Sequence, residues 1–232
     1  MIDIVTVVFR DELPVLQLQA QSIDLYCRNI GVKNIIVVVN DHNSIADQID
    51  PIWWGSLSAQ VRIISRSTFG SSFVDNGWVS QQALKLAVCQ YCENPWYMVL
   101  DAKTIFVRPL NLDDLFDDKQ RLQVGQLDIY PVFERSRQIT NELFGIDLKY
   151  QAGPGGVPFF LNTNDVRAMI VYIERKVKEN FVEWFQAQGM LTEFMLYSGW
   201  IEYRHGLSSC YSINSFFEVC NICHSEVGIA DI

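Results

Sequence analysis

Charged and polar side chains directly follow four apolar segments of the sequence. They lie in the stretches Phe9-Arg10-Asp11, Asn40-Asp41, Arg66-Ser67 and Asp101-Ala102-Lys103. Carboxylates can hold a divalent cation, and Arg and Lys can neutralise phosphate oxygens directly. If the apolar segments are parallel strands of one sheet, these side chains meet at one edge, where ligands bind in α/β proteins. The pattern predicts a site for a phosphate-bearing ligand, possible with or without a bridging metal.

The elements that position these residues alternate between strands and helices. Strands are predicted at residues 2–9, 34–41, 61–65, 96–101 and 157–162, and helices at residues 13–29, 78–92, 165–188 and 192–203. The strand segments are short, apolar and rich in β-branched residues, whereas the longest helix has an apolar stripe at helical spacing. Asn162 or Thr163 can cap that helix at its start. This order predicts an α/β fold with a mostly parallel central sheet flanked by helices.

Composition limits the class of protein. The chain has 232 residues, of which 49% are hydrophobic, so it can bury a sizeable core, and we expect one domain. Its formal net charge of -9 disfavours general binding of nucleic acid, whose phosphates it repels. The first nine residues lack the basic region of a signal peptide, and no apolar run is long enough for a transmembrane segment. We therefore expect a cytoplasmic protein, with peripheral contact at the inner membrane face left open.

Four stretches, in order, resemble a known family. Residues 100–109, Leu-Asp-Ala-Lys-Thr-Ile-Phe-Val-Arg-Pro, resemble the LD-x-D-T-x-F-x-RP segment of GT-A nucleotide-sugar glycosyltransferases. Residues 77–86 look like the preceding helix, 155–162 like the acceptor-side strand, and 192–199 like an acidic E-x-x-x-Y helix start. Together they resemble a GT-A-like family of bacterial polysaccharide-cluster proteins with an Asp-x-Lys variant of the Asp-x-Asp motif.

The resemblance implies a single GT-A-like (Rossmann-like) domain over residues 1–232. Residues 1–110 would form its nucleotide-binding half, and residues 111–232 its acceptor half and C-terminal tail. The implied reaction moves a sugar from a nucleotide-sugar donor to a hydroxyl of a glycan or glycolipid acceptor, in polysaccharide or glycoconjugate biosynthesis.

The resemblance also implies roles for individual residues. Asp101 would organise the donor diphosphate, and Glu193 would lie near the acceptor hydroxyl as general base. Gln81 and Lys85, four residues apart on one helix face, would face the donor or the Asp101 loop. The implied donor-binding set is Thr6, Phe9, Asp11, Asn40, Arg66, Gln81, Lys85, Lys103, Gly155 and Gly156.

The chain departs from this family at the metal site. Lys103 stands where the family has its second aspartate, and a protonated lysine cannot ligate a cation. Asp101 can still hold Mn²⁺ or Mg²⁺ with phosphate oxygens, and His205 lies where such enzymes sometimes supply a late metal ligand. Metal-independent action, with Lys103 neutralising phosphate, is the alternative.

Other interpretations stay open. Asp101 and Lys103 can be ordinary solvated charges at a strand end, and Glu193 can be a first-turn glutamate favoured by the helix dipole. The whole chain can be a non-catalytic nucleotide-sugar or glycan-binding module with a degenerate metal site. A sugar nucleotidyltransferase fits less well, because residues 10–14 after the first strand contain no glycine.

Two cysteine pairs allow a separate metal site. Cys89 and Cys92, and Cys220 and Cys223, have the spacing of zinc ligands, and the sequence from Cys220 to His224 also matches a c-type haem attachment motif. Buried free thiols are the default alternative, because such cysteines behave as small hydrophobic residues.

Overall fold

The computed structural model describes residues 1–41, 43–70, 73–74, 76–119, 121–124, 126–152, 157–213 and 220–222. Its largest sheet has the strand order β3-β2-β1-β4-β9. These strands are β1 (Ile2–Val8), β2 (Val32–Val39), β3 (Val61–Ser65), β4 (Trp96–Asp101) and β9 (Phe159–Asn162). Strands β1 to β4 are parallel, and β9 is antiparallel to β4. The predicted α/β fold with a mostly parallel sheet is confirmed.

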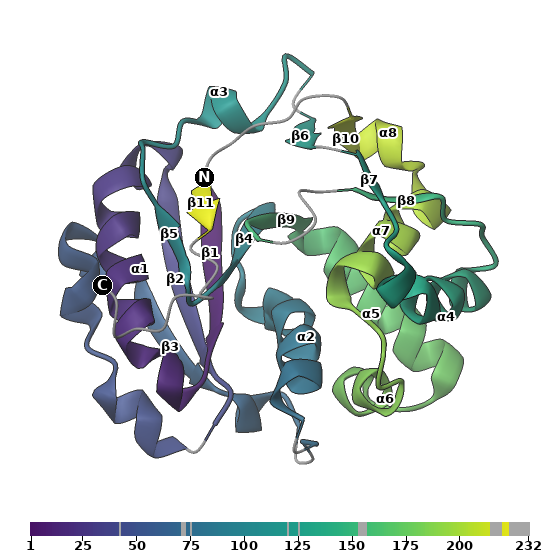
Figure 1. Ribbon diagram of the computed structural model, residues 1–232, viewed down its shortest axis with the longest axis horizontal. Helices are drawn as coiled ribbons and strands as arrows, with labels where there is room; N and C mark the ends of the chain where they lie inside the picture. Colours follow the sequence, from purple (N-terminus) through teal and green to yellow (C-terminus); the bar gives the residue numbers. More distant parts are fainter. Residues whose placement is uncertain are drawn as a thin grey trace.

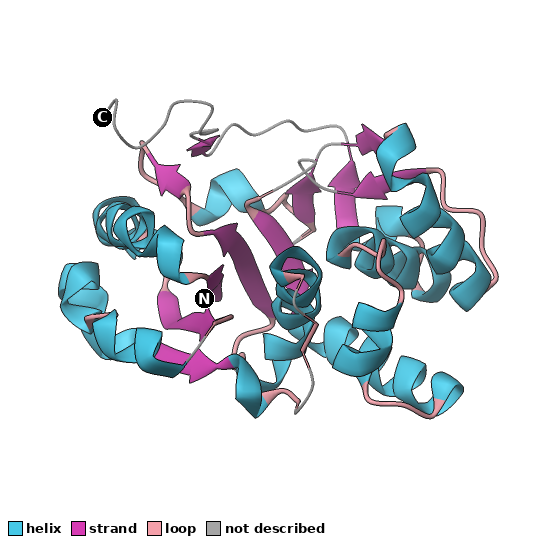
Figure 2. Ribbon diagram, turned by 60° about the horizontal axis from the view of Figure 1, so that its bottom comes forward, coloured by secondary structure: helices cyan, strands magenta, loops and turns pink. Residues whose placement is uncertain are grey.

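Helices flank this sheet because its strands are apolar on both faces. Every residue of β1 is buried, as are the last six residues of β2. Such strands need cover on each side, which α1 (Leu13–Tyr26) and α2 (Gly77–Ala87) help to provide. Figure 2 shows the strands running between helices. The polar residues after each strand are thereby left at the sheet edge.

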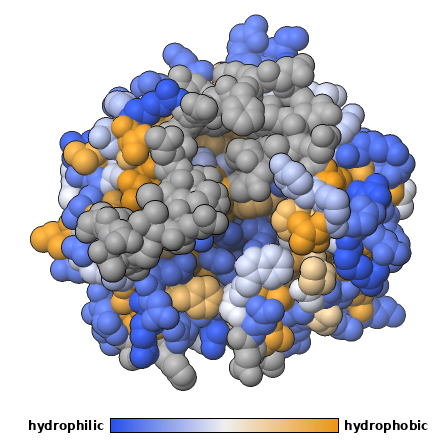
Figure 3. Space-filling model, viewed as in Figure 1, coloured by the Kyte–Doolittle hydropathy of each residue, from blue (hydrophilic) through white to orange (hydrophobic). Residues whose placement is uncertain are grey.

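The second half of the chain adds a group of helices beside the sheet (Figure 1). These helices are α4 (Glu134–Phe144), α5 (Thr163–Val177), α6 (Phe181–Ala187), α7 (Glu193–Arg204) and α8 (Leu207–Cys210). Helix α7 packs against α2, α4 and α5, which joins the two halves. Hydrophilic residues lie at the centre of the face seen in Figure 3, between the sheet and these helices.

Short elements complete the structure. Helix α3 spans Leu112–Leu115. Small strand pairs are formed by β5 (Thr104–Phe106) with β11 (Cys220–Ile222), β6 (Leu122–Val124) with β10 (Tyr211–Ile213), and β7 (Gln126–Asp128) with β8 (Tyr150–Ala152). No helix of the described ranges has both the length and the apolar character needed to cross a membrane.

The predicted helix over residues 165–188 is wrong as one element, because the structure divides it into α5 and α6. Lys178 takes a left-handed conformation with φ 61°, which ends α5, and the Asn180 side chain caps α6 by accepting from Val182 N and Glu183 N. The predicted cap by Asn162 is confirmed, since its side chain accepts from two backbone N–H groups of the first turn. The apolar stripe continues across the break, which hid it from sequence analysis.

The first cysteine pair is buried rather than arranged as a metal site. Cys89 and Cys92 are free thiols, and burial raises the pKa of Cys89 to about 12. Cys223 lies outside the described residues, so the second pair is not placed. Within the described residues the first pair acts as core, which agrees with the default interpretation.

Lys178 permits a test of the helix break. Glycine adopts a left-handed conformation without the Cβ penalty that lysine has there. We expect Lys178→Gly to raise the free energy of unfolding by about 1 kcal/mol, measured by urea denaturation. Lys178→Ala, which keeps the Cβ, is the control and should give no gain. Equal effects of the two variants would contradict the left-handed assignment.

Candidate functional site

The carboxyl edge of the sheet gathers several of the predicted site residues. Asp101, the last residue of β4, is paired in register with Val7 of β1. On the other side of β1, Asn40 N donates to Val8 O at 2.9 Å. Asp101, Phe9 and Asn40 therefore lie at neighbouring strand ends, as the alternating pattern predicted.

One buried ammonium group joins this edge to the second half of the chain. Lys85 Nζ, on α2, lies 2.9 Å from Asp101 Oδ1 and 3.0 Å from Glu193 Oε1, at the start of α7. The Lys85 and Glu193 side chains are only 4% and 2% exposed, whereas that of Asp101 is 28% exposed. In the cluster of Lys85, Asp101 and Glu193, the Lys85 and Glu193 side chains are thus buried, and only the Asp101 side chain reaches solvent.

Burial and charge act in opposite directions on this cluster. Burial raises the pKa of Glu193, and the nearby Lys85 ammonium lowers it without cancelling that rise. For Lys85, burial favours the neutral form, but Glu193 and Asp101 outweigh it and raise its pKa. Lys85 therefore remains a cation at neutral pH, held by two carboxylates.

The surroundings of Glu193 disagree with its predicted role as general base. With its amide nitrogen turned toward the carboxylate, Gln82 donates to Glu193, and the Gln82 oxygen accepts from Trp78 Nε1 at 3.2 Å. The ring of Phe194 lies 5.4 Å from Lys85 Nζ and helps to close this space. A general base must reach the proton that it takes, and Glu193 is enclosed by its partners. The structure favours a positioning role for this residue.

Glu12 is a carboxylate of the edge that sequence analysis missed. It ends a short 3-10 helix over Arg10–Glu12, directly after β1, and Phe9 N donates to its Oε2 at 3.0 Å. Burial raises its pKa most, while the nearby Asp101 raises it further and Lys103 lowers it. Glu12 thus interacts electrostatically with Asp101 and Lys103, and its side chain is only partly buried. Its place directly after a buried strand was the available signal.

Thr6 takes part in a buried network rather than in the exposed edge. Its Oγ1 donates to Gln19 Oε1 at 2.8 Å, and Gln19 Nε2 donates to the carbonyls of Asp101 at 2.5 Å and Thr104 at 3.0 Å. Thr6 is 1% exposed. The enclosed Thr6 side chain helps to hold the turn that presents Asp101, and its predicted contact with the donor stays a prediction.

Asn40 is also buried and supports the start of α2. Its Nδ2 donates to Ser80 Oγ at 2.8 Å and to Gly77 O at 3.2 Å. Arg66 Nη1 lies 3.5 Å from Asn40 Oδ1, and its guanidinium stacks over Phe73. Asn40 therefore orients the edge, whereas the partly buried Arg66 remains a candidate for contact with a ligand.

Phe9 and Gln81 close the space between β1 and α2. A Cβ at Gly77 would come within 2.7 Å of the Phe9 ring, so glycine is needed for this packing. Gln81 Nε2 donates to Val7 O at 3.4 Å, and both Phe9 and Gln81 are partly buried. Asp11 is exposed beside them. The predicted donor-binding role of these three residues stays a prediction.

Of the remaining predicted site residues, the structure places only His205. Gly155 and Gly156 lie outside the described residues. His205 follows the 12-residue helix α7, about 18 Å from Glu193 at 1.5 Å per residue, and pairs with Asp165 at 3.0 Å. Asp165 belongs to the start of α5, where Thr163 N donates to Pro95 O at the amino end of β4. In this structure His205 pairs with Asp165 and does not lie with Asp101, so its predicted role as a metal ligand has no support from this geometry.

Asp101 is the carboxylate of this cluster that could hold a divalent cation, since it alone of the three side chains is partly exposed. The described residues contain no group of three or more His, Cys, Asp or Glu side chains that could hold a metal ion. The Lys85 ammonium pairs with Asp101 Oδ1, which is buried. The exposed part of the Asp101 side chain therefore does not include this oxygen. Mg²⁺ is commonly held by one or two carboxylates together with substrate phosphates. Asp101 therefore suits a cation that arrives with a diphosphate.

Comparison with known proteins identifies the family. A family model, described as a family of unknown function, matches residues 4–221. The chain belongs to the DUF6492 family. No curated protein matches the sequence of this DUF6492 member.

Several solved structures are similar to this DUF6492 chain at low identity. A complex of galactosyltransferase LgtC with donor and acceptor sugar analogues is 13% identical, with a TM-score of 0.45, over 91% of this chain and 73% of that one. An active-site mutant of LgtC is 14% identical, with a TM-score of 0.48, over 91% and 72%. Mouse xyloside xylosyltransferase 1 is 14% identical, with a TM-score of 0.43, over 91% and 85%.

Removal of the buried ammonium tests the cluster. We expect Lys85→Met to lower the free energy of unfolding by about 3–5 kcal/mol, because it leaves Glu193 buried without its cation. Adding Glu193→Gln should restore most of that loss. Lys33→Met, at an exposed ion pair with Glu93, is the control and should cost no more than about 1 kcal/mol. Urea denaturation measures all four proteins, and equal losses at Lys85 and Lys33 would contradict the buried pair.

The Lys85→Met variant should also show a defined pH dependence. Without the ammonium, burial keeps the pKa of Glu193 above its unfolded value of 4.5. The folded state then binds the proton more tightly, so stability is fully present below the unfolded pKa and is lost as the pH rises through the folded pKa. The stability gap to wild type should therefore be smaller at about pH 5 than at about pH 8. A gap that widens toward low pH would contradict this assignment.

Proposed function

We propose that this chain is a glycosyltransferase that moves a sugar from a nucleotide-sugar donor to an acceptor hydroxyl. The observation that carries the proposal is the Asp101 carboxylate, which reaches solvent at the carboxyl edge of the sheet while buried Lys85 holds one of its oxygens. The resemblance of residues 100–109 to the Asp-x-Asp segment of GT-A enzymes supports the same role. The product would enter polysaccharide or glycoconjugate assembly, in the cytoplasm or at the inner membrane face.

The charges at this edge suit a diphosphate leaving group. Lys103 is partly buried and interacts electrostatically with Glu12. Arg66 is partly buried and follows directly after β3. Cations aimed at the phosphates stabilise the negative charge that develops as the sugar–phosphate bond breaks. Asp101, at the end of β4, would orient the diphosphate through a cation that binds to both.

A divalent cation would supply additional charge neutralisation for the leaving group when it binds with the donor. Asp101 would hold it as the single carboxylate ligand, and Lys85 would keep that carboxylate in place from behind. The Lys103 ammonium, two residues after Asp101 in the sequence, would add positive charge at this edge. This arrangement makes a partial dependence on metal the expected behaviour.

Two carboxylates divide the remaining work. Glu193 positions Lys85, and through it Asp101, from the buried side of the cluster. Glu12 is the carboxylate whose partial exposure allows it to reach an acceptor hydroxyl. The burial that raises its pKa also makes it a better proton acceptor in an inverting reaction.

A non-catalytic binding module is the second candidate function. The observation that favours it is Lys103, which replaces the second aspartate of the related motif. Such a module would bind the nucleotide sugar through the same edge without turning it over. Enzymatic turnover separates the two functions.

Loss of the Asp101 carboxylate should abolish chemistry without abolishing the fold. We expect Asp101→Ala to lower donor hydrolysis or transfer by about 10²–10³-fold, because it removes the carboxylate that would hold the cation stabilising the developing negative charge. Asp118→Asn, an exposed carboxylate near Pro95 and Trp96, is the control and should leave the rate unchanged. The rate of nucleotide release from a panel of sugar nucleotides measures the effect. Wild-type protein without turnover, but with nucleotide binding, would favour the binding module.

Nucleotide binding should raise thermal stability. We expect one of UDP, GDP, CMP and dTDP to raise the melting temperature of the wild-type protein, because a ligand that binds only the folded state stabilises it. Mn²⁺ or Mg²⁺ should enlarge the shift in the wild type, and this metal-dependent part should be absent in Asp101→Ala. No shift with any nucleotide, with or without metal, would overturn the donor site.

A further inference from the structure

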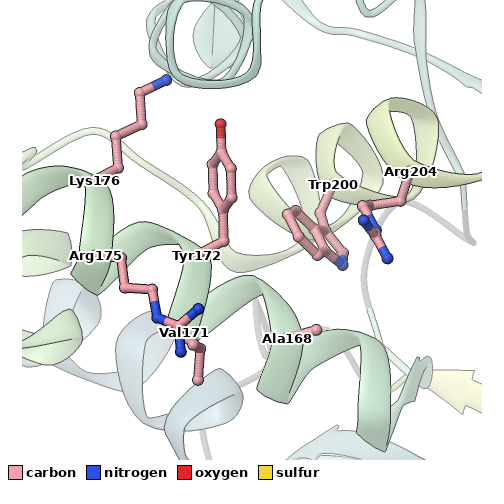
Figure 4. A pocket seen from close by; sticks show the side chains of 7 residues that line it. All are labelled: Ala168, Val171, Tyr172, Arg175, Lys176, Trp200 and Arg204. Carbon is pink, nitrogen blue, oxygen red and sulfur yellow. The ribbon is translucent and has the colours of Figure 1, made fainter.

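A cationic groove with an aromatic floor lies between α5 and α7, away from the carboxyl edge. It is an open groove with a volume of about 520 Å³, within the range of about 300–1,000 Å³ that small-molecule sites occupy. Figure 4 shows Tyr172 and Trp200 between Arg175 on α5 and Arg204 on α7. Lys176 lies at the same groove. No acidic residue is among the side chains that line it.

The two guanidinium groups of this groove lack carboxylate partners. In the described parts of the chain, Arg175 forms no ion pair, and Arg204 stacks over Trp200 with its guanidinium carbon 5.5 Å from the ring centroid. Some other exposed cations of this acidic chain do have such partners, as Lys33 and Arg62 have in Glu93, whereas others, such as Arg108 and Arg135, have none among the described residues. Arginine presents paired N–H groups that match a carboxylate or phosphate. The groove thus offers two uncompensated sites for an anion on a protein whose net charge is -9.

Trp200 supplies an independent indication of a ligand. Its side chain is 2% exposed, and within the described residues its indole Nε1 has no hydrogen-bond partner. A buried N–H group without an acceptor costs free energy, and such groups are rare in folded proteins. Trp200 lines the groove, so an oxygen of a ligand bound there is a candidate acceptor for this N–H group.

We propose that this groove binds an acidic saccharide, a sugar segment that carries carboxylate or phosphate groups. The arginines would hold the acidic groups, the aromatic floor would contact the apolar face of a sugar ring, and Trp200 Nε1 would donate to a sugar or carboxylate oxygen. A single phosphate ion is too small to use the whole groove, and the net negative charge disfavours a nucleic acid. This inference rests on the proposed function, in which the groove would receive a distal part of the acceptor.

Position within the fold agrees with that assignment. Helix α7 begins with Glu193 at the buried cluster and ends with Arg204 at the groove, and its 12 residues span about 18 Å. An acceptor that reached both the groove and Asp101 would have to span at least about this distance. The groove would then select acceptors by charge, separately from the binding of the donor.

Direct binding tests the inference without requiring turnover. Isothermal titration calorimetry would be carried out with an oligogalacturonate as acidic probe, and with a neutral dextran oligosaccharide of equal length. We expect the acidic oligomer to bind, and Arg175→Gln with Arg204→Gln to weaken it by at least about tenfold. Lys33→Gln with Arg62→Gln removes the same charge from the opposite end of the sheet and should leave binding unchanged. The melting temperature of each double variant reports whether it is folded.

Several outcomes would overturn the inference. Equal losses in the two double variants would mean that net charge, rather than the groove, governs binding. Equal binding of the neutral oligosaccharide, or no binding of the acidic one, would exclude an acidic saccharide. Binding to phosphatidylglycerol vesicles that needs Arg175 and Arg204, without binding of the oligomer, would assign the groove to a membrane instead. Nucleotide thermal shifts in the same variants keep a failure of the donor site distinguishable, because they do not depend on the groove.

Discussion

The buried ammonium group of Lys85 is the interaction on which the geometry of the candidate site depends. A charge removed from water is expensive unless opposite charges compensate it at close range. Lys85 meets this condition with one carboxylate from the end of β4 and another from the start of α7. Lys85 and Glu193 are 108 residues apart in the sequence, so satisfying this one cation fixes how the second half of the chain lies against the sheet.

The same constraint separates residues that support the edge from residues that can touch a ligand. Glu193, Thr6 and Asn40 are polar but buried, and each forms hydrogen bonds with neighbouring protein atoms. Asp101 and Glu12 keep part of their side chains at the surface. A polar residue at a strand end is therefore not by itself a ligand contact, because the buried backbone and charges of the edge need partners first.

Helix α7 gives the molecule a link between its two polar regions. Its first residue belongs to the buried cluster, and its last turn carries Arg204 at the cationic groove. Helix α7 also packs against α4 and α5, which restricts its movement relative to the rest of the second half. A ligand that spans both regions would therefore meet them at a distance set by the rigid rise of the helix.

The sequence alone determined the α/β class, the central strands and the edge at which Asp101, Lys103 and Arg66 lie, because apolar periodicity and strand ends are local properties. Residues 61–65 and 96–101 form strands with the predicted bounds, since β-branched and aromatic runs of this length specify buried strands well. Only the tertiary structure decided that Glu193 is enclosed, that Glu12 belongs to the edge, that His205 lies at the far end of α7, and that α5 and α6 are separate. Those outcomes depend on which distant side chains share a buried space and on which charges compensate each other there, and neither is encoded in local spacing.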